Sequence, residues 1–400
     1  MATYDDFADK LIDKLGDTKL GGNLGALIGQ LQKMAEAVRE INAAMTSLYK
    51  VTDETNARYT RFLTDTLQNA KKLGRTVSNL IEQTTNWAKL GFSLNQAEEL
   101  AKTSSIYANI SGIDDDTAIK NLAAAIKEFR IEASDSIGIV DRLSNLGKNY
   151  STSSAGFGAA LGDAASALAS AGNNVDESLA LIAALSEITK DSEEAGNALQ
   201  TLGERMAGAD GDASTYSKEL NQLSQQIQLM TQTTDTPKGI SVFTDSTRTD
   251  CKSTYQLLLD ISQVWGQLNQ TNRSALLDTL VGSEYSDALA ELLSNMGQAE
   301  NALSTVLASG GSALEAQERA LDSIDATTAQ FEAAFQSLAN TVVDSGLVKF
   351  FVDLGTSGVS ALDSLINKVG ALPALGAAIG GTLALKNVGM AQHSLPSSLL

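Results

Sequence analysis

The first 236 residues of the chain contain no proline, and its three prolines are Pro237, Pro373 and Pro396. Proline interrupts a helix because it lacks a backbone N–H and its ring clashes with the preceding turn. Alanine, leucine, glutamine, glutamate and lysine, which favour helices, are plentiful in the same stretch. The sequence therefore predicts an all-α chain with a long amino-terminal helix or coiled coil, a compact multi-helix core, a second helical unit and hydrophobic carboxy-terminal helices.

An apolar seam near the amino terminus predicts self-association. Its residues alternate in steps of four and three, which is the heptad pattern of a left-handed coiled coil. The seam consists of Leu20, Leu24, Leu27, Leu31, Met34, Val38, Ile41, Met45 and Leu48. A long helix with such a stripe buries it against copies of itself or against later helices of the same chain. We favour the homo-oligomer.

Beyond Leu48 the same register continues less regularly from Tyr59 to Leu90. Polar Thr52 and Thr55 occupy positions that the register would make apolar. Polar seam residues can fix the register of a coiled coil at a cost in stability, or they can mark helices that are not continuously coiled. Both interpretations are compatible with the sequence.

Residues 92–210 predict a compact core of short helices, each preceded by a polar cap. The spacing of a capping box occurs at Ser93 with Gln96, Asn174 with Glu177, and Asp191 with Glu194. Apolar residues recur every three or four positions, which predicts one buried stripe per helix. The three acids Asp114 to Asp116 fit a helix start, where the helix dipole favours negative charge, and a calcium loop is the alternative.

Composition divides the chain further. The threonine-rich stretch 231–250 contains Pro237 and no helical period, so it predicts a linker in which Ile240, Val242 and Phe243 could form a brief strand. After the linker we expect Trp265 to anchor a second core. The predicted divisions are 1–91 amphipathic and coiled-coil helices, 92–210 core, 211–250 polar helix and linker, 251–310 second helical unit, 311–368 long amphipathic helices, and 369–400 hydrophobic segment and tail.

An uncharged run from Val369 to Leu385 has 17 residues, near the lower limit for a membrane-spanning helix. The residues proposed to face lipid or another helix are Leu372, Leu375, Gly376, Ile379, Gly380, Leu383 and Leu385. Gly376 and Gly380 have the spacing of a close helix contact. One interpretation is a membrane-active segment, and the other is a buried oligomer contact or hydrophobic end.

Charge and composition argue against several classes of function. The net charge of −19 disfavours sequence-specific nucleic-acid binding, which needs clustered lysine and arginine. The only histidine is His393 and the only cysteine is Cys251, so the sequence predicts no catalytic residue, no metal site and no internal disulfide. No phosphate-binding glycine motif occurs, and we expect no cofactor and no enzymatic activity. The amino terminus lacks the features of a secretory signal, which predicts a protein made in the cytoplasm.

Several stretches resemble bacteriophage tail tape measure proteins. They are LAKTSSIYANISGIDDDTAIKNLAAAIKEF, SIGIVDRLSNLGKNYSTSSAGFGAAL, SAGNNVDESLALIAALSEITKDSEEAGNALQTLGERM, STYQLLLDISQVWGQLNQTNRSALLDTLVG, ALAELLSNM and FEAAFQSLANTVVDSGLVKFFVDLG. The resemblance covers about three-quarters of the chain, from about Phe92 onward. After Gly282 the family usually carries a short basic and polar run, whereas this chain reads GSEYSDALAELL, so no role is assigned to basic side chains there.

The resemblance implies a structural ruler that sets tail length during assembly and is then released to assist DNA entry. The implied partners are copies of the chain itself (three or six), tail tube and baseplate or tail-tip proteins, tail assembly chaperones and the host membrane. The implied location is the virion tail, after a stay in the host cytoplasm. The competing classes are a cytosolic coiled-coil scaffold and a helical pore-forming protein.

Overall fold

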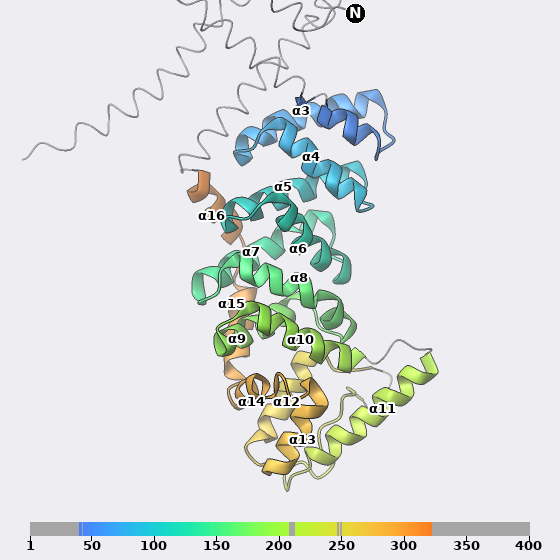
Figure 1. The fold of residues 1–400 in the computed structure, drawn as a ribbon, viewed down its shortest axis with the longest axis vertical. Coiled ribbons are helices and arrows are strands. Elements are labelled where there is room, and N and C mark those ends of the chain that lie inside the picture. Colours follow the sequence, from blue (N-terminus) through green and yellow to red (C-terminus); the bar gives the residue numbers. More distant parts are fainter. Residues whose placement is uncertain (1–39, 42, 208–212, 246–247, 249, 322–400) are drawn as a thin grey trace, which may run out of the picture. The chain divides into compact units, whose positions relative to one another are not determined.

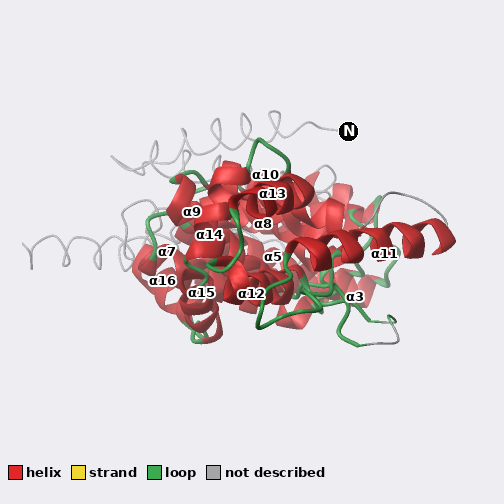
Figure 2. Ribbon diagram, turned by 90° about the horizontal axis from the view of Figure 1, so that it is seen from below, coloured by secondary structure: helices red, strands yellow, loops and turns green. Residues whose placement is uncertain are grey.

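The computed structural model describes residues 40–41, 43–207, 213–245, 248 and 250–321. These residues belong to one compact unit, Ala37–Gln336, which is described here by itself. The prediction of an all-α chain is confirmed, since these residues form helices connected by loops, the longest of which joins α11 to α12 (Figure 2). Within them, strand pairing is limited to an isolated antiparallel bridge between Phe243 and Cys251, at the stretch where a brief strand was expected.

The first half of the unit contains a helical segment at residues 40–41 and 43–49, followed by eight labelled α-helices and one 3-10 turn. They are α3 (Asn56–Leu73), α4 (Val77–Lys89), α5 (Leu94–Ser111), α6 (Asp115–Glu128), η1 (Ala133–Asp135), α7 (Ile137–Asn149), α8 (Ser154–Ser170), α9 (Val175–Thr189) and α10 (Ser192–Ala207). The second half contains α11 (Ala213–Met230), α12 (Thr254–Trp265), α13 (Gln270–Val281), α14 (Ser286–Ser294), α15 (Gly297–Leu307) and α16 (Ser312–Leu321).

Two rows of helices run side by side through the unit (Figure 1). In the first row α3, α4, α5, α6, α8 and α10 contact one another in that order, and α10 then contacts α13. In the second row the order of contacts is α16, α7, α15, α9, α14 and α12. The last five helices therefore return along the first half of the chain, so that α15 packs against α7 and α9, and α16 packs against α5 and α7.

The expected helix caps are formed. Ser93 with Gln96 and Asn174 with Glu177 make complete capping boxes. At the third predicted box, the Asp191 carboxylate accepts the N–H of Glu193 at 2.8 Å, but the Asp191 N–H is held by the Thr189 hydroxyl. The third box is therefore only half formed, because a nearer hydroxyl takes the place of the glutamate side chain.

Small residues let α8 and α10 pack closely. A Cβ added at Gly203 would lie 2.7 Å from the carbonyl carbon of Ala167, and one added at Gly196 would lie 3.1 Å from Cα of Ala160. Both pairs repeat at an interval of seven residues, or two helical turns. The small residues thus give close backbone contact between α8 and α10 beside the buried leucines of both helices.

The last three seam residues, Ile41, Met45 and Leu48, are buried in the core of this unit. The residues from Leu20 to Val38 lie outside the described residues, so the oligomerisation seam stays a prediction. From residue 40 to 90 the chain forms separate helices rather than one, because it turns at 50–55 and again at Gly74. Thr55 caps α3, and Gly74 ends it in the left-handed conformation with φ of 65°.

The stretch predicted as a linker packs against α11, where the N–H of Val242 donates to the Ser224 hydroxyl at 3.4 Å. Val242 and Phe243 are buried, and the N–H of Lys252 donates to the carbonyl of Val242 at 2.8 Å. Trp265 is buried as expected, and its Nε1–H donates to the hydroxyl of Ser294 at 3.0 Å. The hydrophobic run Val369–Leu385 lies outside the described residues. Among the helices that are described, none combines the length and apolar character needed to cross a membrane.

Candidate functional site

Four polar side chains lie along one face of α7, and together they hold the returning end of the chain. We call Asp141, Ser144, Asn145 and Lys148 the α7 polar face; their spacing of three, one and three places them on one side of the helix. The opposite stripe of α7 is apolar and buried, and it consists of Ile139, Val140, Leu143 and Leu146. A helix with this pattern normally leaves its polar face in water. Here Asp141 and Ser144 are instead buried, with 9% and 5% of their surface exposed.

Asp141 caps the start of α16. Its two carboxylate oxygens accept the backbone N–H groups of Gly311 at 3.1 Å and of Ala313 at 2.8 Å. These are among the amides that a helix start leaves without a partner, and the helix dipole favours a negative charge there. The cap therefore comes from a different helix, far away in the sequence, instead of from the residue that precedes α16.

The other three residues of the α7 polar face extend the same contact. The Asn145 amide donates to the carbonyl of Thr305 near the end of α15, at 2.8 Å. Lys148 donates from Nζ to the hydroxyl of Ser312 at 2.7 Å, and Ser144 lies 3.3 Å from the same hydroxyl. One face of α7 thus satisfies polar groups at both ends of the loop that joins α15 to α16.

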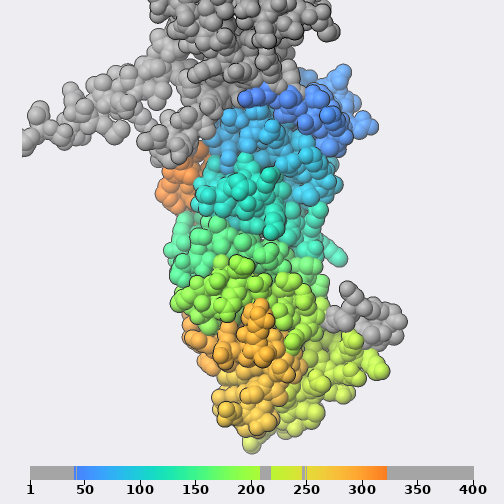
Figure 3. Space-filling view, in the orientation of Figure 1, coloured from blue at the N-terminus to red at the C-terminus, as the bar shows by residue number. Residues whose placement is uncertain are grey.

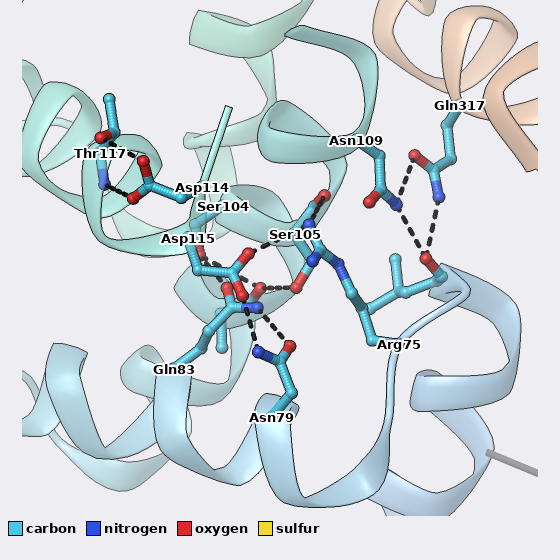
Figure 4. Close-up of polar contacts among 12 residues, drawn as sticks. Arg75, Asn79, Gln83, Ser104, Ser105, Asn109, Asp114, Asp115, Thr117 and Gln317 are labelled. Carbon is cyan, nitrogen blue, oxygen red and sulfur yellow. Dashed lines mark hydrogen bonds and ion pairs between the residues drawn. The ribbon is translucent and has the colours of Figure 1, made fainter. Parts of the chain in front are cut away.

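A second set of polar contacts joins α16 to α5 and to the end of α3 (Figure 4). The Asn109 side-chain amide donates to the carbonyl of Leu73 at 2.8 Å and to Oε1 of Gln317 at 3.1 Å. The Gln317 amide also donates to the Leu73 carbonyl, at 3.4 Å. This carbonyl is in the last turn of α3, where the helix itself supplies no donor. The side chain of Gln317, which is only 5% exposed, therefore takes part in a contact among α16, α5 and α3.

A chain of hydrogen bonds continues from this region through α4, α5 and α6 (Figure 4). We call it the α4–α6 polar network, and it consists of Arg75, Asn79, Gln83, Trp87, Ser104 and Asp115. Trp87 donates to Ser104 at 3.1 Å, and Ser104 donates to Gln83 at 2.8 Å. From Gln83 the chain passes through Asn79 to Asp115, which lies 3.0 Å from Arg75. Most of the buried polar groups are thereby paired, which lowers the cost of burying them, but Nε of Arg75 is buried without a hydrogen-bond partner.

The acids at the start of α6 are used as capping and bridging groups. Asp114 caps the helix, and the hydrogen bonds from Thr117 lower the pKa of the Asp114 carboxyl. Asp115 pairs with Arg75 and Asn79, and Asp116 accepts a hydrogen bond from Asn86 at 3.3 Å. The helix-start interpretation is confirmed. Across the described residues, no group of three or more histidine, cysteine, aspartate or glutamate side chains is placed to hold a metal ion.

The side chain of Arg205 caps the end of α13, the helix that precedes Gly282. The Arg205 guanidinium of α10 donates to the carbonyls of Asp278 and Thr279, which belong to the last turn of α13. A cation at this position also complements the negative end of the helix dipole. The basic group near Gly282 thus comes from α10, and the residues that follow Gly282 are acidic and apolar.

The site could be predicted only in part from the sequence. The capping role of Asp114 follows from local spacing. The α7 polar face and Gln317 were not identified, because a polar stripe on an amphipathic helix has the same pattern whether water or another helix covers it. A buried amide such as Gln317 gives no periodic pattern of its own.

The described contacts are helix caps, paired polar groups and close helix packing. The profile of the family described as phage-related minor tail protein matches residues 67–282, which is more than half of the chain. The match includes the α7 polar face and the α4–α6 polar network, and it ends at Gly282. No solved structure matches this chain. This chain belongs to the family of phage-related minor tail proteins, whose role is in the structure of the virion tail.

Proposed function

We propose that the chain is a tail tape measure protein, a ruler whose length sets the length of the tail. The observation that carries the proposal is that the family match, 67–282, covers a series of helices in which α3, α4, α5 and α6 contact one another in chain order. Helices that contact their neighbours in chain order can be drawn out along an axis once the contacts of α8 with α6 and α10 open. A ruler needs this property, because its length must scale with its number of residues.

The resemblance to tape measure proteins gives the proposal its finer content. Three or six copies of the chain would associate through the amino-terminal seam and would be surrounded by tail tube rings, with baseplate or tail-tip proteins at one end. Assembly chaperones would bind the copies before the tube does. At about 1.5 Å per residue, a fully helical chain of 400 residues would span about 600 Å.

The test is the length of tails assembled with a shortened chain. Deleting residues 20–33 removes two heptads, preserves the register of the seam, and leaves the buried residues Ile41, Met45 and Leu48 in place. If this segment is measured as a helix, tails become shorter by about 20 Å, rounded to whole tube rings. Intact tails of unchanged length would contradict the ruler role for this segment.

A second proposed role is release from the tail to assist DNA entry. It rests on the uncharged run Val369–Leu385 and on the resemblance. A synthetic peptide of this run should bind and permeabilise lipid vesicles, while a peptide with Leu375→Lys and Ile379→Lys should not. Failure of the unmodified peptide to bind would remove the support for a membrane role. The family match favours a tail protein over an unrelated cytosolic scaffold or pore-forming protein.

A further inference from the structure

The helix α16 is held in a different way from its neighbour α15. The buried residues of α15 are Ala299, Ala302 and Val306, all apolar, and they pack toward α7 and α9. The fully buried residues of α16 are Ser312, Ala313 and Gln317, so the small side chain of Ala313 is the one apolar group among them. Of the two leucines of α16, Leu314 is 54% exposed and Leu321 is half-buried.

Polar contacts provide the rest of the docking. Asp141 caps the start of α16, Lys148 and Ser144 hold Ser312, and Asn109 holds Gln317. When polar contacts open, water replaces them, so each neutral contact contributes little net free energy, and the charged cap from Asp141 contributes more. Exposed apolar surface gains no comparable contact with water, so burial of apolar surface is the stronger source of docking free energy. The helix α16 buries little apolar surface. The same polar contacts fix the orientation of α16 against α7 and α5, because hydrogen bonds form only within a narrow range of distances and angles.

Undocking of α16 would uncover a surface that suits water. The surface beneath α16 includes the α7 polar face and Asn109, and the apolar stripe of α7 faces the other side. In Figure 3 the orange residues of α16 lie at the surface beside the cyan residues of α5. Undocking therefore exposes polar groups of α7 and α5, together with the small side chain of Ala313.

We propose that α16 is a reversible clasp. It bridges α7, α5 and the end of α3, and it undocks while the rest of the two rows stays folded. This inference rests on the proposed ruler function for its purpose: the clasp keeps the returning end of the chain against the first half, and its undocking is the first step when the compact unit is drawn out. The polar docking makes that step independent of unfolding α8 and α10.

Hydrogen exchange of the full 400-residue chain, followed by mass spectrometry, tests the clasp. Amides of α16 should exchange at least tenfold faster than the buried amides of α15 and α8, because they open by undocking alone. Asp141→Asn, which removes one charge-assisted cap, should speed exchange in α16 by about tenfold or more and leave α8 unchanged. Leu314→Ala is the matched control: it changes an exposed side chain of the same helix and should leave all these rates unchanged.

A reversible cross-link makes the test independent of any loss of stability. Ser144 Oγ and Ser312 Oγ lie 3.3 Å apart, so Ser144→Cys with Ser312→Cys, in a Cys251→Ser background, should form a disulfide. Oxidation should slow exchange in α16 to the rate of α15, and reduction should restore it.

Exchange in α16 that is as slow as in α15 and α8 in the unmodified chain would overturn the clasp. So would an Asp141→Asn variant in which α16 and α8 accelerate together, because α16 would then open only with the whole unit. Neither result bears on tail length. Conversely, a fast-opening α16 in a chain whose deletions leave tail length unchanged would keep the clasp and reject the ruler.

Discussion

Ala313 donates its backbone N–H to the carboxylate of Asp141 at 2.8 Å, across 172 positions of sequence. This single contact ties the returning end of the chain to the middle of its first half. It also explains why a charged residue is buried on α7, since the start of a helix supplies the donors that a buried carboxylate needs. Most other helices of the unit begin with a cap from the residue just before them, as at Ser93 and Asn174.

We expect Gly203→Ala to destabilise the chain by about 1–3 kcal/mol, because the added Cβ would overlap the Ala167 backbone and force α8 and α10 apart. Gly266→Ala is the control, since a Cβ there meets nothing within 4 Å and φ is −62°. It should be neutral or stabilise by up to about 1 kcal/mol. Denaturant unfolding of both variants measures the difference, and equal effects would contradict close packing at Gly203.

Gly158→Ala should also be destabilising, because its Cβ would lie 1.9 Å from the hydroxyl oxygen of Tyr107. Burial raises the pKa of this hydroxyl to about 12, consistent with a tightly enclosed group. In a Tyr107→Phe background the clash is partly relieved, so Gly158→Ala should cost less there. A double-mutant cycle with no coupling between the two positions would show that they do not touch.

The stability of the chain should depend on the charge of Glu187. A hydrogen bond from the Ser151 hydroxyl lowers the pKa of Glu187 below its ordinary 4.5. A carboxyl with a lowered pKa in the folded state stabilises above its unfolded pKa, and this stabilisation is lost as the pH falls through the folded pKa. The free energy of unfolding should therefore exceed that of Glu187→Gln by more at pH 7 than near pH 3. A pH-independent difference would contradict the contact.

The pH dependence of stability at Glu82 should have the opposite sign to that at Glu187. Its burial, and then the charges of Glu40, Asp115 and Asp116, raise the pKa of Glu82. A carboxyl with a raised pKa destabilises the fold as the pH rises through that pKa. Glu82→Gln should therefore gain stability relative to the natural chain between pH 3 and pH 7, as followed by thermal unfolding at each pH. A loss over the same range would show that the acids do not act on Glu82.

Self-association should depend on the amino-terminal seam. Leu31→Asp together with Val38→Asp places charges at two seam positions that lie outside the described residues, and it should abolish oligomers in sedimentation experiments. Lys50→Asp, on an exposed residue just after the helical segment at residues 43–49, is the control. Oligomers that survive the double substitution would refute the coiled coil.

Local features of the fold could be predicted from the sequence, and long-range ones could not. Ser93 and Asn174 were identified because a capping box involves residues three apart. Both ends of α3 were missed: Thr55, which caps its start, was assigned to the seam, and Gly74, which ends it, was not considered as a helix end. Heptad spacing says which residues are apolar on one face, but not whether the helix continues between them.

The docking of α16 was outside the reach of sequence patterns. Asp141 lies on a face that pattern analysis assigns to water, and its partner Ala313 carries no polar side chain that could be matched to it. Likewise, nothing in the sequence around Asn109 indicates that its side chain pairs with Gln317. Such contacts depend on how helices far apart in the chain come together, and they leave no periodic trace in either segment.

Duplication of residues 20–33 distinguishes a ruler from a chain that is only needed for assembly. A deletion can shorten tails by damaging assembly, but damage does not lengthen them. If the chain acts as a ruler, electron microscopy should show tails longer than those of the natural phage by about 20 Å, rounded to whole tube rings. Intact tails of unchanged length would contradict the ruler.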